Sequence, residues 1–303
     1  MQKLPPFSWE SAQTFLAVVT HGSFSRAARA LDLGQPTVSR RIAQLEQILS
    51  EQLFRRGKHG AEPTSAAHDL IPAAEQMAKW ATEFERIAQG SESEIAGVVT
   101  IAAPPGVAVE QLAAFAALLR TQHPHLRLEV LSAVAHVDLT RGDADIAIRT
   151  NAPTETGLVA ALRAQSQTVV VAAPGYAASL DPPCAWQDLA WTTWTDSFRH
   201  VAPRPMLEKV IDNFTPIFTA DDYLVQKAAV RAGMGATMVG LPRPVDAAAH
   251  KRLRDEGLVI IEMEVELPVS EVFVVCAKSS QHIPRVRAVL LALKEAISDT
   301  AAL

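Results

Sequence analysis

The apolar and polar positions from Ser23 to Leu45 follow the spacing of two short helices joined by a tight turn. Ser23 suits the N-cap of the first helix, and Pro36 falls at or near the first position of the second, where its missing N–H costs nothing. The second helix repeats apolar residues at four- and three-residue steps, at Val38, Ile42 and Leu45. This pattern predicts a helix-turn-helix whose second helix has one buried face and one polar face.

The polar face of the second helix carries the residue types that a DNA-reading helix needs. Short polar groups near its N-terminal end reach base edges in the major groove, and longer cations further on hold phosphates. The alternative is an ordinary helical hairpin with a solvated polar face. We predict that Gln35, Pro36, Thr37, Ser39 and Arg40 position the helix and contact bases, and that Arg41, Arg55, Arg56 and Lys58 mainly contact phosphates. Ser23 is also a predicted DNA-binding residue.

A basic loop follows the hairpin. Residues 52–54 have the pattern of a short strand, and Gly57 and Gly60 then bracket the tip of the loop. This arrangement predicts a wing that lies along the DNA backbone or the minor groove. A basic loop that is merely solvated is the alternative.

The hairpin and its flanks resemble the N-terminal domain of LysR-type transcriptional regulators, and the resemblance extends through Thr64. The shared positions are Ser23, Phe24, Ala27, Ala28, Gln35, Pro36, Ser39, Arg40, Leu45, Glu46, Leu53, Phe54 and Arg56. Gly34 departs from the family by replacing a capping Ser, Ser50 by replacing a frequent Gly, and Pro63 by replacing a Leu. The resemblance implies a protein that binds a double-stranded DNA operator and works with RNA polymerase at a promoter.

The stretch from residue 65 to 89 is rich in Ala and has the pattern of one long helix, with Pro72 one turn after its start. A long helix between two domains has little of its own chain to pack on, so an apolar stripe along it suggests pairing with a second chain. The stripe that we predict to form the dimer contact is Leu70, Ala74, Met77, Ala81 and Phe84. The family resemblance implies a homodimer or a homotetramer built as a dimer of dimers.

Beyond the polar stretch 90–93, strand patterns alternate with helix patterns to the end of the chain. We expect strands at 98–103, 126–131, 145–149, 168–172, 237–240, 259–264 and 271–276, and helices at 107–122, about 206–214, 221–232 and 284–297. This alternation predicts an α/β body with mostly parallel sheets. About 210 residues exceed one compact core, so two subdomains are expected.

The body also resembles LysR-type effector domains, which share the periplasmic-binding-protein fold of type II. The resemblance rests on Gly97 to Ile101, Asp138 to Arg149, Pro174 to Tyr176, and Ala232 to Gly235 ahead of Leu241-Pro242. The expected architecture is an all-α winged helix-turn-helix, a long linker helix and an α/β effector domain. The boundaries that we predict are 1–64, 65–90 and 91–303, with subdomain I at about 91–165 and 269–303 and subdomain II at about 166–268.

Charge is divided unevenly along the chain. Residues 1–64 contain eight Lys or Arg against five Asp or Glu, a balance of +3, which leaves −8 for the remainder of a chain whose formal charge is −5. A basic reader joined to an acidic body suits a regulator and does not suit a protein that coats nucleic acid. The chain is 49% apolar and 20% charged and shows neither a membrane-length apolar run nor a signal segment, so we expect a cytoplasmic protein.

Several residues permit an enzyme or cofactor hypothesis, and each has a simpler interpretation. Asp143 and Asp145 fit turn and capping roles, Gly233-Met-Gly235 fits a helix C-terminus, and His123-Pro-His125 lacks a third metal ligand nearby. Cys276 lies in an apolar run, whereas Cys184 follows a Pro-Pro loop and is a candidate exposed thiol. We predict no catalytic residues, no metal and no cofactor.

The effector should bind between the two subdomains, where helix N-termini point inward and their N–H groups suit an anion. LysR-type proteins commonly recognise small organic acids in such a cleft. The predicted lining is Pro104, Pro105, Gly106, Val107, Arg149, Thr150, Asn151, Trp194, Thr195, Ser197, Phe198, Thr219 and Asp221. Pro104 to Gly106 departs from the family, which often has a Ser or Thr hydroxyl there, so backbone donors would have to serve.

Two classes of function fit the sequence. The first is a sequence-specific transcriptional regulator of the LysR type that responds to a small, anionic effector. The second is a free-standing binding or catalytic α/β protein that does not act on DNA, and the basic helix-turn-helix with its wing counts against it. Retention on DNA-cellulose at low salt separates the two classes.

Overall fold

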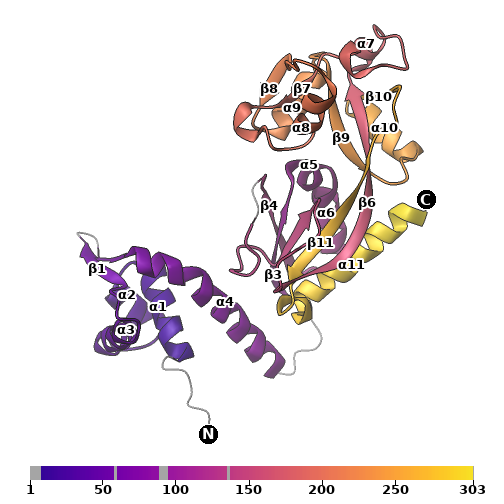
Figure 1. The fold of residues 1–303 in the computed structure, drawn as a ribbon. Coiled ribbons are helices and arrows are strands. Elements are labelled where there is room, and N and C mark those ends of the chain that lie inside the picture. Colours follow the sequence, from indigo (N-terminus) through magenta and orange to yellow (C-terminus); the bar gives the residue numbers. More distant parts are fainter. Residues whose placement is uncertain (1–7, 58–59, 89–94, 135–136, 303) are drawn as a thin grey trace. The chain divides into compact units, whose positions relative to one another are not determined.

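The computed structural model describes residues 8–57, 60–88, 95–134 and 137–302 (Figure 1). The chain forms two compact units, which are residues 1–94 with 140–143 and residues 95–139 with 144–303. Each unit is described by itself below. Lys58 and the expected boundary at 90–93 lie outside the described residues.

The first unit is a helical domain with a two-stranded wing. Buried residues from all three short helices and the wing form its core, including Phe15, Val18, Ile42 and Leu53. Ser23 and Gly34 are the N-caps of the second and third helices, although neither side chain makes a cap hydrogen bond. The elements are α1 (Trp9–His21), α2 (Phe24–Ala30), α3 (Gln35–Leu49), β1 (Phe54–Gly57), β2 (Gly60–Pro63) and α4 (Ser65–Ala88).

The wing strand starts two residues later than the sequence predicts, because β1 begins at Phe54 and pairs antiparallel with β2 through Phe54 and Pro63. The N–H groups of Leu53 and Phe54 bind the carboxylate of Glu46 and not a neighbouring strand. The wing is anchored at Gly60, whose φ is +136° and where a Cβ atom would lie 2.1 Å from the carbonyl oxygen of Gly22. Only glycine lets these two backbones approach so closely.

Helix α4 packs its first turns on its own domain. Ala67 and Ala74 are buried in the core of the first unit, and Leu70 and Ile71 pack against that core. Pro72 lies inside the helix, which continues past it. Two predicted dimer residues, Leu70 and Ala74, therefore have neighbours within their own chain.

The second unit consists of two lobes that share one seven-stranded sheet. Lobe I packs α6 and α11 on one face of its strands, where Ile101, Leu112, Ile146 and Val289 are buried. A second cluster, which includes Phe273 and Val275, covers the other face. The elements of lobe I are β3 (Gly97–Ala103), α5 (Pro105–Val107), the π-helical turn η1 (Ala108–Leu112), α6 (Ala113–Gln122), β4 (Leu126–Ser132), β5 (Ile146–Arg149), the first part of β6 (Leu158–Ala172), β11 (Val269–Ala277), η4 (Ser280–His282) and α11 (Pro284–Ala302).

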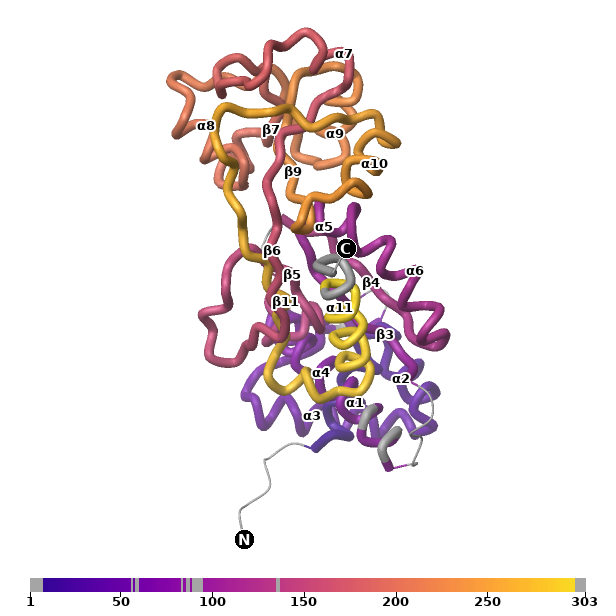
Figure 2. Tube along the Cα trace, turned by 90° about the vertical axis from the view of Figure 1, so that its right-hand side faces the viewer, coloured from indigo at the N-terminus to yellow at the C-terminus, as the bar shows by residue number. Residues whose placement is uncertain are grey.

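Lobe II is built around the far end of β6, with buried clusters on both faces of its strands. Figures 1 and 2 show β6 running from lobe I into lobe II, and the chain returning to lobe I along the segment that leads into β11. The elements of lobe II are α7 (Pro174–Ala177), η2 (Trp186–Asp188), β7 (Thr192–Trp194), η3 (Asp196–Phe198), α8 (Arg204–Val210), β8 (Phe218–Ala220), α9 (Tyr223–Arg231), β9 (Ala236–Pro242), α10 (Ala247–Asp255) and β10 (Val259–Ile261).

The expectation of mostly parallel sheets is wrong. Within the large sheet β3 pairs parallel with β4 and β5, whereas β6 pairs antiparallel with β9, β10 and β11, and β11 pairs antiparallel with β5. The reason is that β6 and β11 each extend through the connection between the lobes, so the chain crosses twice in opposite directions. The smaller sheet of β7 and β8 is parallel.

Both cysteines are buried, so the candidate exposed thiol at Cys184 is also wrong. Burial raises the pKa of both thiols, that of Cys276 to about 11, which keeps them protonated near neutral pH. No helix in the described part of the chain is both long and apolar enough to cross a membrane.

Candidate functional site

The exposed face of α3 is the first candidate site. Val38, Ile42 and Leu45 are buried, as the sequence predicts. Among the predicted DNA contacts, Gln35, Pro36 and Arg40 are exposed, and Thr37, Ser39 and Ser23 are partly exposed. The polar groups of this helix therefore face outward at its N-terminal end, as insertion into a major groove requires.

Arg41 and Arg55 lie at different positions around this face. Arg41 is partly buried, and its Nη1 donates a hydrogen bond to Oγ1 of Thr14 on α1 at 3.3 Å. Arg55 is exposed on β1, opposite Glu62 in the wing register. The backbone of Arg56 belongs to β1. The exposed side of α3 also includes Gln44, one turn after Arg40, which the sequence analysis did not select.

Glu46 connects α3 to the wing. Its Oε1 accepts hydrogen bonds from the backbone N–H groups of Leu53, at 2.8 Å, and Phe54, at 3.3 Å. A carboxylate that accepts two N–H groups fixes the direction in which the chain leaves the helix. The backbone that leads into β1 thereby obtains a defined position relative to α3.

Replacing Glu46 with Ala should loosen the wing and weaken operator binding roughly tenfold, because hydrogen bonds to a charged group contribute about 1.5–3 kcal/mol. The measurement is operator affinity as a function of salt concentration. Glu46→Gln keeps one acceptor oxygen and should retain more affinity than Glu46→Ala. Glu51→Ala removes an exposed carboxylate nearby and serves as the control; equal losses for Glu46→Ala and Glu51→Ala would contradict the assignment.

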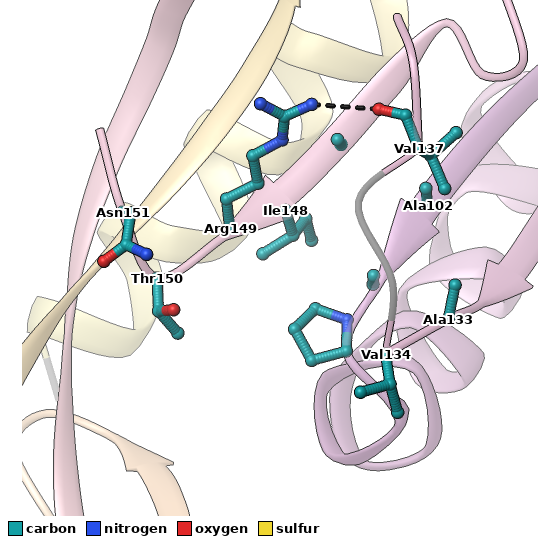
Figure 3. A pocket seen from close by; sticks show the side chains of 11 residues that line it. Ala102, Ala133, Val134, Val137, Ile148, Arg149, Thr150 and Asn151 are labelled. Carbon is teal, nitrogen blue, oxygen red and sulfur yellow. Dashed lines mark hydrogen bonds between the residues drawn. The ribbon is translucent and has the colours of Figure 1, made fainter. Parts of the chain in front are cut away.

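A pocket of about 100 Å³ opens in lobe I at the ends of β3 and β5 (Figure 3). Four of the residues that the sequence analysis selected lie in it, namely Pro104, Arg149, Thr150 and Asn151. The other lining residues are small or apolar: Ala102, Ala103, Ala133, Val134, Val137, Ala147 and Ile148.

Arg149 is buried at the edge of this pocket, and its charge already has partners. Its Nη1 lies 3.1 Å from Oε1 of Glu155. Its Nη2 donates to the carbonyl oxygen of Val137 at 3.0 Å, a hydrogen bond drawn in Figure 3. The pKa of the Glu155 carboxyl is lowered, first by its own backbone N–H and then by Arg149. An anion bound here would have to share the Arg149 guanidinium with the exposed carboxylate of Glu155 or displace that carboxylate.

The lobe II residues of the predicted site lie outside this pocket. Trp194 is buried, and its indole N–H donates to the carbonyl oxygen of Ala202 at 2.9 Å. Phe198 packs against the Trp194 ring, and Ser197 is exposed. The structure therefore brings together only the lobe I part of the predicted lining in the described pocket.

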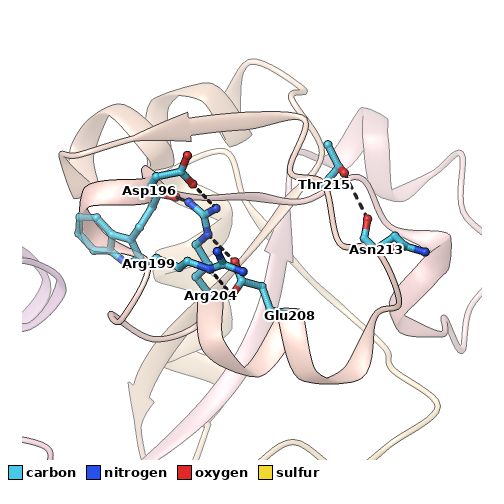
Figure 4. Close-up of polar contacts among 7 residues, drawn as sticks. Asp196, Arg199, Arg204, Glu208, Asn213 and Thr215 are labelled. Carbon is cyan, nitrogen blue, oxygen red and sulfur yellow. Dashed lines mark hydrogen bonds and ion pairs between the residues drawn. The ribbon is translucent and has the colours of Figure 1, made fainter.

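The loop after β7 is held by a buried arginine. Arg204 on α8 donates to the carbonyl oxygen of Trp194 at 2.7 Å, to Oδ1 of Asp196 at 2.5 Å, and to Oε1 of Glu208 at 2.9 Å (Figure 4). Arg199 binds the other oxygen of Glu208 at 2.7 Å. The sequence analysis did not select this network, although the four-residue spacing of Arg204 and Glu208 on α8 is a local signal for their ion pair. The network fixes the loop that contains Thr195 and Ser197.

The ends of β7 and β8 nevertheless lie close to lobe I. The N–H of Thr195 donates to the carbonyl oxygen of Ala220, and α9 begins three residues after Ala220. A methyl group placed on Gly106 of lobe I would come within 3.5 Å of the Tyr223 ring on α9. The carboxylate of Asp222 accepts from the N–H groups of Leu224 and Val225 and so occupies the N-terminus of α9.

Two of the features that permitted an enzyme hypothesis have structural roles. Oδ2 of Asp145 accepts the backbone N–H of Thr100 at 2.9 Å and so joins β5 to β3. Gly233 follows the end of α9 with φ of +93°. Among the described residues, no three His, Cys, Asp or Glu side chains gather as metal ligands would.

Comparison with known sequences identifies both units. The family model described as LysR substrate binding domain matches residues 92–298, and the one described as bacterial regulatory helix-turn-helix protein, lysR family, matches residues 9–68. The HTH-type transcriptional regulator PtxR of Pseudomonas aeruginosa is 29% identical over 67% of this chain and 65% of its own. CrgA of Neisseria meningitidis serogroup B is 30% identical over 60% of each chain. These matches span somewhat less than two thirds of either relative.

Solved structures show the same fold over the full length. A full-length OxyR variant from Pseudomonas aeruginosa has a TM-score of 0.65 at 16% identity and covers 97% of both chains. CbnR in complex with its target DNA has a TM-score of 0.59 at 16% identity, covering 95% of this chain and 99% of its own. Because a family model matches more than half of the chain and a second matches its DNA-binding unit, the chain belongs to the LysR family of transcriptional regulators, which are not enzymes.

Proposed function

We propose that this protein binds an operator through the exposed face of α3 and its wing, and that a small effector bound in the second unit alters that binding. The observation that carries the proposal is the arrangement of α3. Its apolar residues are buried, whereas Gln35, Pro36 and Arg40 are exposed beside a wing that carries Arg55. CbnR, which has a similar fold, was solved with its target DNA.

The effector that we propose is a small anion held between the lobes. Two features support an anion, namely the buried guanidinium of Arg149 and the unpaired N–H groups expected in the first turn of α5. The first intrahelical bond there runs from Ala108 to Pro104, so the N–H groups of Gly106 and Val107 precede it. The pocket of about 100 Å³ is smaller than typical ligand sites of about 300–1,000 Å³, so an effector that enters it would extend towards lobe II.

The remaining partners follow from this role. A regulator that reads an interrupted palindrome needs two helix-turn-helix units, so we propose that the chain acts as a homodimer or homotetramer. It would act on the chromosome in the cytoplasm, beside RNA polymerase at the promoter.

The effector is tested by a thermal-shift screen of small carboxylates, followed by operator binding with and without each hit. If none of the hits alters operator binding, the result counts against an anionic effector.

Once an effector is found, Arg149→Ala should weaken its binding roughly tenfold or more, because a charge-assisted hydrogen bond to the anion is lost. Thr195→Ala and Ser197→Ala test the lobe II side by the same titration. Arg163→Ala removes an exposed arginine whose partner is Glu271 and is the control. If all three site variants bind the effector as tightly as the wild type, the proposed cleft is misplaced.

A further inference from the structure

A buried lysine joins the two lobes of the second unit. Lys227 on α9 of lobe II places its Nζ 2.5 Å from Oε1 of Glu110, which lies on the π-helical turn η1 of lobe I. The hydroxyl of Tyr223 donates to the same oxygen at 3.1 Å. Lys227 also lies 2.6 Å from Oε2 of Glu256 within lobe II, in an ion pair whose angles are not those of a hydrogen bond.

The charges in this cluster favour a contact that can open. The Lys227 side chain is only 11% exposed, so its charge needs a partner, and Glu256 supplies one within the same lobe. Glu110 is a second carboxylate on the same ammonium, which leaves one excess negative charge. Its departure would not leave Lys227 buried without a counter-charge, and this removes the main penalty for breaking a buried ion pair.

The backbone conformation at Glu110 also favours a conformational change that would release this contact. It lies within the π-helical residues Ala108–Leu112, between α5 and α6. Single π-turns inside α-helices are rare and occur often at functional sites. If the turn became α-helical, residues before it would rotate by about 100° relative to α6, and Glu110 would turn away from Lys227.

We propose that Glu110 is a latch that holds lobe I against lobe II through Lys227 and Tyr223, and that its release opens the effector cleft. This inference rests on the proposed function only for the role of the cleft, because the contacts themselves involve neither DNA nor effector. Glu256 acts in the opposite sense. It competes with Glu110 for the same ammonium and makes release easier.

The test measures the distance between the lobes in the full-length protein. Spin labels at Arg120→Cys in lobe I and Lys251→Cys in lobe II are attached at exposed positions, while both native cysteines are buried. Mixing labelled protein with excess unlabelled protein leaves one labelled chain in each oligomer. Pulsed electron resonance then gives the distribution of lobe–lobe distances.

Glu110→Gln should raise the fraction of molecules with a changed distance roughly tenfold, as the loss of one charge-assisted hydrogen bond predicts. Glu256→Gln removes the same charge from the same cluster and should have the reverse effect. It should lower the fraction of molecules with a changed lobe–lobe distance and so narrow the distribution. Glu271→Gln, in an exposed ion pair with Arg163, should leave it unchanged. If Glu110→Gln folds poorly, Tyr223→Phe removes only the hydroxyl and should shift the distribution in the same direction by a smaller amount.

Equal distributions for wild type and Glu110→Gln, or shifts of Glu110→Gln and Glu256→Gln in the same direction, would overturn the latch. That result would leave the proposed regulator intact, because operator binding and the effector screen are measured separately. Conversely, a chain that bound neither operator nor effector could still show opposite shifts for the two variants.

Discussion

Arg40→Ala should weaken operator binding by roughly tenfold to a hundredfold, because Arg40 is exposed on the outward face of α3 beside Gln35 and Pro36. A base contact of this kind contributes about 1–3 kcal/mol and acts at one base pair. The loss should therefore fall on one operator position, and specificity at that position should relax. Affinities for operators substituted one base pair at a time measure both effects.

Arg55→Ala provides the contrast that makes this prediction specific. A phosphate contact should weaken binding to all sequences about equally and reduce the log–log salt slope by about one unit. Arg254→Ala removes the same charge from an exposed position on α10 of the second unit and is the control. If Arg40→Ala leaves both the operator affinity and its salt slope unchanged, the outward face of α3 is not the DNA-reading surface.

Local periodicity was sufficient to predict α2, α3 and α4. Val38, Ile42 and Leu45 are buried because an α-helix returns to the same side at these steps, and no distant residue is needed to see this. The start of the wing strand could not be predicted in the same way. It depends on Glu46, whose carboxylate takes the N–H groups of Leu53 and Phe54 from seven and eight residues away.

The second unit shows where alternation of strands and helices misleads. β6 spans Leu158–Ala172, but only its last four residues are both apolar and buried without interruption. Its middle part, residues 163–168, is mostly polar, and residues 158–167 pair antiparallel with β11. The sequence predicted βαβ units because it does not reveal that two strands cross between lobes in opposite directions.

The candidate effector site was predictable only in part, for a related reason. Pro104 directly follows β3 and Arg149 is the last residue of β5, and these two strands pair in parallel, so the proximity of the two residues follows from topology. The partner of Arg149, Glu155, and the contact of Lys227 with Glu110, 117 residues away, depend on packing that no local pattern records.

Met77→Glu combined with Phe84→Glu should dissociate the oligomer, with a dissociation constant raised roughly a hundredfold or more. Large apolar side chains are exposed in the second half of α4, where Phe84 is 74% exposed and Trp80 is 39% exposed, whereas Leu70 and Ala74 contact the domain core. Large apolar side chains exposed in this way suit a helix that pairs with a second copy. A carboxylate in that contact would be buried without a counter-charge.

Sedimentation velocity of the double variant and of each single variant, over a range of protein concentrations, measures this effect. Thr82→Glu adds a carboxylate to an exposed position on another face of α4 and should leave the oligomer intact. Circular dichroism establishes that the variants keep their helices, so that dissociation is not confused with unfolding. An undisturbed oligomer in the folded double variant would show that α4 does not form the contact, and the exposed Phe84 would then need another explanation.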